Sequence, residues 1–101
     1  MTSEQVDNLH LIVGRRWTAW ILMAMLDRDG PMRFGELLAS VQGLSKRLLT
    51  DRLIELEAAD IVRRDVRPDR PVTITYALTE RGASLRPALD ALRTWNAQNS
   101  A

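Results

Sequence analysis

The stretch "GLSKRLLTDRLIELEAADIVRR", Gly43–Arg64, combines regularly spaced leucines with basic residues near both of its ends. Ser45 is a favourable N-cap residue, so the pattern predicts a helix that follows Ser45 and continues to about Ala59. The two faces of this helix differ: one carries Leu49, Leu53 and Leu56, and the other carries Arg47, Thr50 and Asp51 in the first two turns. The leucine face is expected to join a core, and the polar face is expected to be open.

The composition restricts the kind of protein that this helix can belong to. The chain has 101 residues, 46% apolar and 27% charged, which is typical of a single globular domain spanning residues 1–101. Lys and Arg number 14 against 13 Asp and Glu, so a basic surface requires segregation of the charges in space. The chain has no cysteine, which excludes disulfides, thiolate catalysis and cysteine-ligated zinc, and its one histidine leaves little for metal binding or general-base catalysis. We expect a protein that is not an enzyme and has no metal or cofactor.

No segment reads as a membrane span or a secretion signal. The longest unbroken apolar run, from Ala19 to Leu26, has eight residues, whereas a spanning helix needs about 20. The first 14 residues lack the basic start and apolar centre of a signal peptide. We therefore expect a cytoplasmic protein.

Three helices are predicted before the opening stretch. Thr2 and Gln5 have the spacing of a capping box, and apolar residues follow at helical intervals until Gly14. Residues 16–28 are apolar on nearly all sides, tryptophans included, and end at the turn signal "DGP", so this second helix is expected to be the buried centre. A short third helix fits residues 35–41, and a tight link then leads into the opening stretch.

The remainder of the chain reads as a hairpin followed by a helix. Residues 61–67 and 72–78 alternate as strands do, around the tip "PDRP" at 68–71. Thr79 is expected to cap a last long helix that bends at Pro87, because proline lacks the N–H that the helix would use. An apolar stripe runs along this helix through Leu85, Leu89, Leu92 and Trp95.

Two helices joined by a short link, with a hairpin after the second, predict an α+β but mainly α fold, the winged helix-turn-helix with a two-stranded wing. A helix is about 10–12 Å across and fits the DNA major groove, which is about 12 Å wide, and its N-terminus offers free N–H groups to phosphates. Basic residues lie where such contacts are needed, at Lys46 and Arg47 and on both sides of the wing tip, at Arg67 and Arg70.

Four blocks of the sequence together resemble the HxlR-type transcriptional regulators of the MarR-like winged-helix group. The blocks are "GRRWT" at 14–18, "GPMRFGEL" at 30–37, "LSKRLLTDRLIELE" at 44–57 and "IVRRDVRPDRPVTITYALTERG" at 61–82. The resemblance implies a homodimeric DNA-binding regulator whose first and last helices form the dimer contact and whose two recognition helices read a palindromic operator. Several members sense oxidants through a cysteine near the N-terminus, and the corresponding position here is Ser3, so the resemblance implies that a thiol switch is absent.

The candidate site residues follow from the pattern and the resemblance together. Arg47 and Thr50 are assigned to base edges, Ser45 and Lys46 to phosphates, and Arg67 and Arg70 to added charge at the wing. The candidate dimer residues are Leu9, Val13, Leu89, Leu92 and Trp95. Trp17 and Trp20 are candidates for a pocket that takes a small aromatic effector.

Each of these assignments has an alternative. Arg47 and Asp51 are four residues apart and could form a solvated ion pair, and the wing arginines could be ordinary surface charge. The tryptophans could serve only core and dimer packing. For the whole chain, the alternative to a DNA-binding repressor is a winged-helix module that docks onto another protein, whose binding would respond weakly to salt.

Overall fold

The computed structural model describes the backbone of residues 1–14 and 17–99, and the side chains of these residues except 6–8 and 13–14. The helices are, in chain order, α1 (Ser3–Leu9), the π-helical η1 (His10–Gly14), α2 (Thr18–Arg28), α3 (Phe34–Ser40), α4 (Lys46–Ala58), α5 (Glu80–Ala83) and α6 (Arg86–Asn99). The strands are β1 (Met32–Arg33), β2 (Val62–Arg67) and β3 (Thr73–Leu78).

The first helix begins as its sequence predicts. The backbone N–H of Thr2 donates to Gln5 Oε1 at 2.9 Å, and the backbone N–H of Gln5 donates to Thr2 Oγ1 at 3.2 Å, which is the reciprocal pattern of a capping box. The predicted extension to Gly14 is present, but its last five residues form the wider π-helical η1. Of the predicted start of the second helix, Arg16 lies outside the described residues, and α2 is seen from Thr18 onward.

The sheet has one strand more than the sequence predicts. β2 and β3 form the expected antiparallel hairpin, in which Val62 pairs with Leu78 and Arg67 with Thr73. The short β1 pairs with the other edge of β3, so the strand order is β1-β3-β2. Two residues are too few for a visible alternation in the sequence, which explains why β1 was not predicted.

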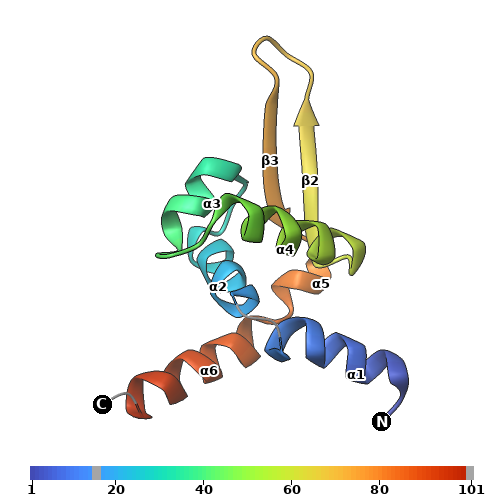
Figure 1. Ribbon diagram of the computed structural model, residues 1–101, viewed down its shortest axis with the longest axis vertical. Coiled ribbons are helices and arrows are strands. Elements are labelled where there is room, and N and C mark those ends of the chain that lie inside the picture. Colours follow the sequence, from blue (N-terminus) through green and yellow to red (C-terminus); the bar gives the residue numbers. More distant parts are fainter. Residues whose placement is uncertain (15–16, 100–101) are drawn as a thin grey trace.

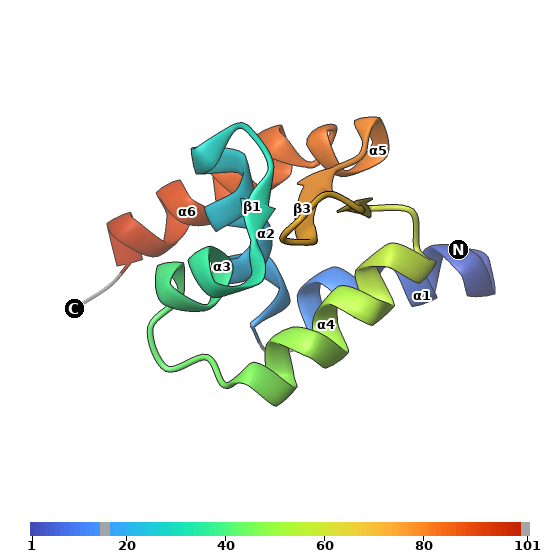
Figure 2. The ribbon, with the colours of Figure 1, turned by 90° about the horizontal axis from the view of Figure 1, so that it is seen from above.

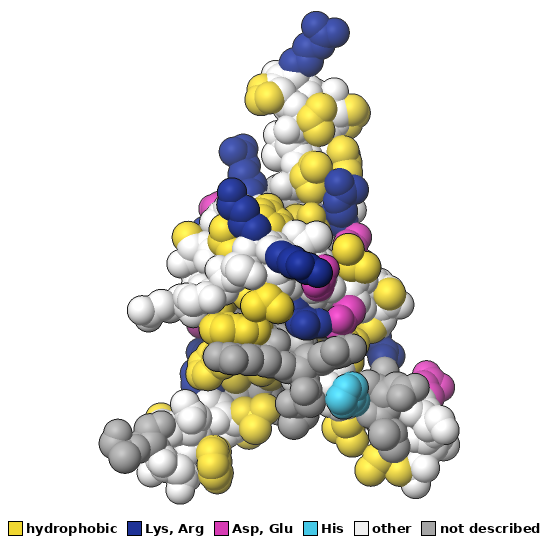
Figure 3. All heavy atoms as spheres, in the orientation of Figure 1, with side chains coloured by type: hydrophobic (Ala, Val, Ile, Leu, Met, Phe, Trp, Pro, Cys, Tyr) yellow, Lys and Arg dark blue, Asp and Glu magenta, His cyan; other side chains and the backbone are white. Residues whose placement is uncertain are grey.

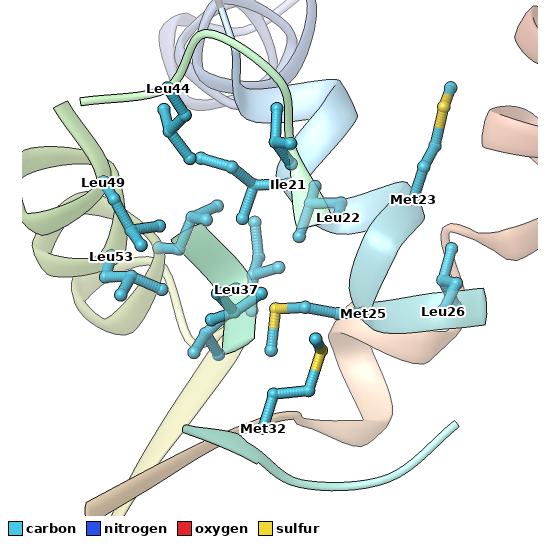
Figure 4. Close-up of a cluster of buried hydrophobic side chains, with 14 of the residues drawn as sticks. Ile21, Leu22, Met23, Met25, Leu26, Met32, Leu37, Leu44, Leu49 and Leu53 are labelled. Atoms are coloured by element: carbon cyan, nitrogen blue, oxygen red, sulfur yellow. The ribbon is translucent and has the colours of Figure 1, made fainter. Parts of the chain in front are cut away.

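The core lies where α2 meets α3, α4 and the base of the hairpin. Figure 4 shows side chains of α2 pointing toward Leu37 of α3 and toward Leu49 and Leu53 of α4. The leucine face predicted for α4 is confirmed, since Leu49, Leu53 and Leu56 are all buried. Trp20, predicted to lie in the buried centre, is instead 53% exposed, because the side of α2 on which it lies is not covered.

The C-terminal segment differs from its prediction. One helix with a bend at Pro87 was expected, but α5 and α6 are separate helices with Ser84 and Leu85 between them. Thr79 caps only the short α5, through a bond from the Gly82 N–H to its Oγ1 at 3.0 Å. Pro87 is the second residue of α6, where the helix does not need its N–H, so the proline helps to begin a helix.

These elements form a winged helix-turn-helix with helices added at both ends of the chain. In Figure 1, α2 is central, α3 and α4 lie beside it, and the hairpin extends away from them as the wing. The helices α1 and α6 lie at the opposite end of the molecule from the hairpin tip (Figure 1). Viewed from above, α4 runs along one side of the molecule (Figure 2). Within the described residues, no helix has the length and apolar character needed to cross a membrane.

Candidate nucleic-acid interface

The start of α4 is a capped N-terminus with donors left open. Ser45 Oγ accepts from the backbone N–H of Leu48 at 3.1 Å, as its N-cap assignment predicts. In the described part of the chain, the backbone N–H groups of Lys46 and Arg47 have no acceptor. Because the Ser45 hydroxyl only accepts in the cap, its own proton is left to donate to an anion. This terminus can therefore bind phosphate oxygens through backbone N–H groups, a hydroxyl and the Lys46 ammonium.

The outward face of α4 carries the residues that the sequence assigns to base edges. Arg47 and Thr50 are both exposed. Thr50 Oγ1 donates to the backbone carbonyl of Lys46 at 2.8 Å, so the hydroxyl is used within the helix and the methyl group is left for an outside contact. A methyl group suits the C5-methyl of thymine, and the guanidinium of Arg47 suits the two acceptors of guanine.

Ile54 completes this face and was missed by the sequence analysis. It follows Arg47 by seven residues, which is two helical turns, and it is 59% exposed. An isoleucine in a helix suggests a core residue, so its type gave no functional signal. The signal available was its position, in phase with Arg47 and Thr50 and out of phase with the leucine face.

The expected alternative for Arg47 was an ion pair with Asp51. Among the residues that the structure describes, the ion pair on α4 joins Arg52 to Glu55, and none joins Arg47 to Asp51. The Arg47 guanidinium is thus available to an outside acceptor.

Two exposed basic side chains of the wing lie at or near its tip. Arg67 at the end of β2 and Arg70 in the turn are both exposed. Nearer the base, Arg63 Nε donates to Asp65 Oδ2 at 2.9 Å, so one wing arginine is balanced by a carboxylate. Figure 3 shows basic side chains over α4 and up to the tip of the hairpin, with acidic side chains beside some of them on the lower part of the same face. The charge on this face is therefore basic toward the wing tip and mixed lower down (Figure 3).

The helix before the link is fixed by a carboxylate. Glu36 Oε1 accepts from the backbone N–H of Arg33 at 2.9 Å, and Glu36 Oε2 accepts from Arg28 Nη2 at 2.9 Å. The bond from the Arg33 backbone, together with the Arg28 guanidinium, holds the pKa of Glu36 below its usual value. The carboxylate is therefore ionised at neutral pH and connects the end of α2 to the start of α3.

Of the residues assigned to a dimer contact, three are exposed and one is buried in the structure. Leu9, Leu92 and Trp95 are exposed, at 52%, 44% and 63%, on α1 and α6. The side chain of Val13 lies outside the described part of the chain. Leu89 is 1% exposed and packs in the core of the protomer, so its assignment to the dimer surface is wrong. It faces α2 because it is one turn beyond Leu85, which packs against the same core.

The two tryptophans assigned to a pocket do line one cavity. It has a volume of about 430 Å³ and lies between α2 and the link that joins α3 to α4. Trp17, Trp20, Met23 and Asp27 contribute from the α2 side, and Val41 and Gln42 contribute from the link. This volume is within the range of about 300–1,000 Å³ that small-molecule sites occupy.

Comparison with known proteins connects this geometry to a family. The model of the HxlR-like helix-turn-helix family matches residues 12–101. The HTH-type transcriptional regulator YvaP of Bacillus subtilis (strain 168) is 43% identical over 84 residues, which cover 83% of this chain and 76% of that protein.

Solved structures agree with the sequence match. The reduced form of the transcriptional regulator YodB from B. subtilis superposes with a TM-score of 0.82 at 34% identity, covering 99% of this chain and 95% of that one. The redox regulator HypR in its oxidized form superposes with a TM-score of 0.85 at 32% identity, covering 96% and 98% of the two chains. All three of these proteins are named as regulators.

Proposed function

We propose that the protein acts as a homodimeric repressor that occupies a palindromic operator. The chain belongs to the HxlR-like helix-turn-helix family and is a DNA-binding transcriptional regulator rather than an enzyme. The observation that carries the proposal is the outward face of α4, where Arg47, Thr50 and Ile54 are exposed in one line behind a capped N-terminus. A protein-docking module would not need this face, and that alternative is not favoured.

The proposed DNA contacts divide into two kinds. Ser45, Lys46, Arg67 and Arg70 bind phosphates, which position the protein but carry no sequence information. Arg47, Thr50 and Ile54 contact base edges in the major groove and determine the sequence that is read. Two-fold symmetry then places the two α4 helices in successive major grooves, about 34–36 Å apart.

The proposed dimer forms through α1 and α6. Leu9, Leu92 and Trp95 are large apolar side chains that a monomer leaves in water, all at the end of the molecule opposite the wing tip. Exposed apolar side chains gathered in this way favour association with a second copy. Joining the protomers at this end leaves both wings and both α4 helices free for one DNA duplex.

Regulation is proposed to depend on a bound small aromatic effector. The similar structures of YodB and HypR are a reduced form and an oxidized form, but this chain has no cysteine to oxidise, and the resemblance places Ser3 at the family's N-terminal cysteine position. The cavity at Trp17 and Trp20 is the proposed effector site.

Selection of bound fragments from genomic DNA, followed by footprinting, tests the proposed function. We expect an inverted repeat with half-site centres separated by one helical turn, and protection of both half-sites by the same protein concentration. The affinity should fall with salt at a logarithmic slope of about −5, if three phosphate-binding cations act in each protomer. Binding that selects no sequence, or that hardly responds to salt, would contradict the proposal.

A further inference from the structure

We propose that the cavity beside Trp17 and Trp20 binds a planar aromatic cation, and that this ligand acts on α4 through the link that precedes it. The inference rests on the proposed regulatory function, because DNA binding is the property that the ligand would change. The ligand is positively charged, Asp27 recognises that charge, and Trp17 connects the bound ligand to the recognition helix α4.

The lining of the cavity selects for positive charge. Two indole rings provide electron-rich faces, which attract flat aromatic rings and attract cations more strongly. Asp27 is the charged residue among the described side chains that line the cavity, and its charge is negative. The other lining groups are apolar, such as Met23 and Val41, or neutral and polar, such as Gln42. A neutral aromatic would gain no charge attraction from the carboxylate, and an aromatic acid would be repelled by it.

The carboxylate of Asp27 already holds a planar cation of the protein itself. Arg93 of α6 donates from Nη1 to Asp27 Oδ1 at 3.0 Å, and both side chains are about half exposed. In the described part of the chain, Asp27 Oδ2 has no hydrogen-bond partner. A pair this exposed is weak, so a bound cation can compete with the guanidinium for the carboxylate. Binding would then loosen the connection between α2 and α6.

Trp17 connects the cavity to the helix-turn-helix link. A Cβ atom added to Gly43 would lie 3.3 Å from Trp17 Cη2, so the indole ring is in close contact with the backbone of the link. Gly43 has φ of 85°, which suits glycine, and it precedes the N-cap Ser45 by two residues. Trp17 itself has φ of 78°, an uncommon conformation for a bulky residue. A ligand that stacks on Trp17 would therefore shift the indole ring against Gly43, in the link that positions the start of α4.

The binding step can be tested on the free protein, without DNA. The probe is N-methylquinolinium, and its neutral counterpart of the same shape is quinoline at neutral pH. Proton–nitrogen correlation spectra resolve the indole N–H signals of the three tryptophans, and the signal of Trp95, which does not line the cavity, should shift less than the other two. We expect saturable shifts of the Trp17 and Trp20 signals, and an affinity for the cation at least about fivefold above that for quinoline.

Three variants separate recognition of charge from structural damage. Asp27→Asn should lower the affinity for N-methylquinolinium to about that for quinoline. Asp69→Asn removes the same charge at the wing tip and should leave the affinity unchanged. Arg93→Gln should raise the affinity by about two- to fivefold, because it removes the competing guanidinium. A merely structural role of the Asp27–Arg93 pair would make both of its variants bind worse.

Two outcomes would overturn the proposal. Equal affinity for the cation and for quinoline, or a response led by Trp95, would show that the cavity does not recognise positive charge. If the cation binds as expected but operator affinity is unchanged at saturation, the effect on α4 is refuted. Failure of operator binding without any ligand would instead count against the proposed function, and the spectra would still decide whether the cation site exists.

Discussion

Leu53 and Ile54 are neighbours in the sequence, but they lie on opposite sides of the boundary between core and surface. Leu53 is 2% exposed and Ile54 is 59% exposed. The helical period places the first against α2 and the second beside the line of Arg47 and Thr50. The same kind of side chain therefore stabilises the fold at one position and is available to DNA at the next.

Alanine at Leu53 should lower the stability of the fold, whereas alanine at Ile54 should weaken DNA binding. Leu53→Ala should lower the free energy of unfolding by about 2–5 kcal/mol, because it leaves a cavity in the core. Ile54→Ala should change the free energy of unfolding by less than about 0.5 kcal/mol. It should weaken operator binding by about 1 kcal/mol through the lost contact with a thymine methyl. Urea unfolding and DNA titration measure the two quantities. An operator with uracil in place of thymine should abolish the difference in binding, and a persistent difference would refute the methyl contact.

At the scale of elements, α5 is attached to the start of β2 so closely that one position requires glycine. A Cβ atom at Gly82 would lie 2.2 Å from the backbone carbonyl oxygen of Ile61. Thr79 reinforces the attachment, since its Oγ1 donates to the backbone carbonyl of Asp60 at 2.6 Å and accepts from the Gly82 N–H. This contact fixes the base of the wing relative to α6, which follows.

Gly82→Ala should therefore destabilise the protein, and Gly35→Ala is its matched control. A Cβ atom at Gly35, in α3, meets nothing within 4 Å. We expect Gly82→Ala to lower the free energy of unfolding by about 1–3 kcal/mol or more, because the backbone of Ile61 must move. Gly35→Ala should instead leave it unchanged or raise it by up to about 1 kcal/mol. Thermal unfolding of both variants checks this, and equal effects would contradict the close packing of α5 on β2.

Elements with strong local signals could be predicted from the sequence. α4 was predicted within one residue at its end, because its N-cap and its leucine period are both contained in the segment itself. The hairpin was predicted because its alternation and its proline-bounded tip are local as well. The outward placement of Arg47 and Thr50 followed from the same period, and both residues are exposed.

The features that were missed depend on contacts distant in the sequence. β1 exists through its pairing with β3, in which Met32 lies opposite Tyr76. Trp20 was expected in the core because α2 is apolar on nearly every side, and such a helix does not reveal which side its neighbours leave open. The break before α6 was missed because Pro87 can either bend a helix or begin one, and the choice depends on how α5 packs.

The whole molecule separates its two proposed contacts, with DNA on the side of α4 and the wing, and the partner protomer at the α1–α6 end (Figure 1). The wing tip and the α1–α6 end are opposite each other along the longest dimension, which is 46 Å. The cavity beside Trp17 lies between α2 and the link to α4, and its Asp27 is bonded to Arg93 of α6. It is therefore connected both to the recognition helix and to a helix of the proposed dimer.

Trp95→Glu tests the proposed dimer. It places a charge where we expect an apolar seam, so the dimer dissociation constant should rise by at least about tenfold. Ala97→Glu adds the same charge two residues later, on the other side of the exposed α6, and should have little effect. Sedimentation at several protein concentrations measures the change. A parent protein that is monomeric at micromolar concentration, or two variants that weaken the dimer equally, would refute the assignment.

The central claim is that the outward face of α4 reads DNA bases while the wing contributes charge, and one comparison tests it most directly. The affinities of the parent, Arg47→Ala and Arg70→Ala proteins are measured for the selected operator and for a scrambled duplex over a range of salt concentrations. Arg47→Ala should cost about 1–3 kcal/mol on the operator, and much less on the scrambled duplex, and should relax the preference at one base pair in each half-site. Arg70→Ala should weaken both duplexes nearly alike and reduce the salt slope by about 1 per site. If Arg47→Ala, with its fold verified, binds the operator as tightly and as selectively as the parent, then α4 does not read the bases and the claim is wrong.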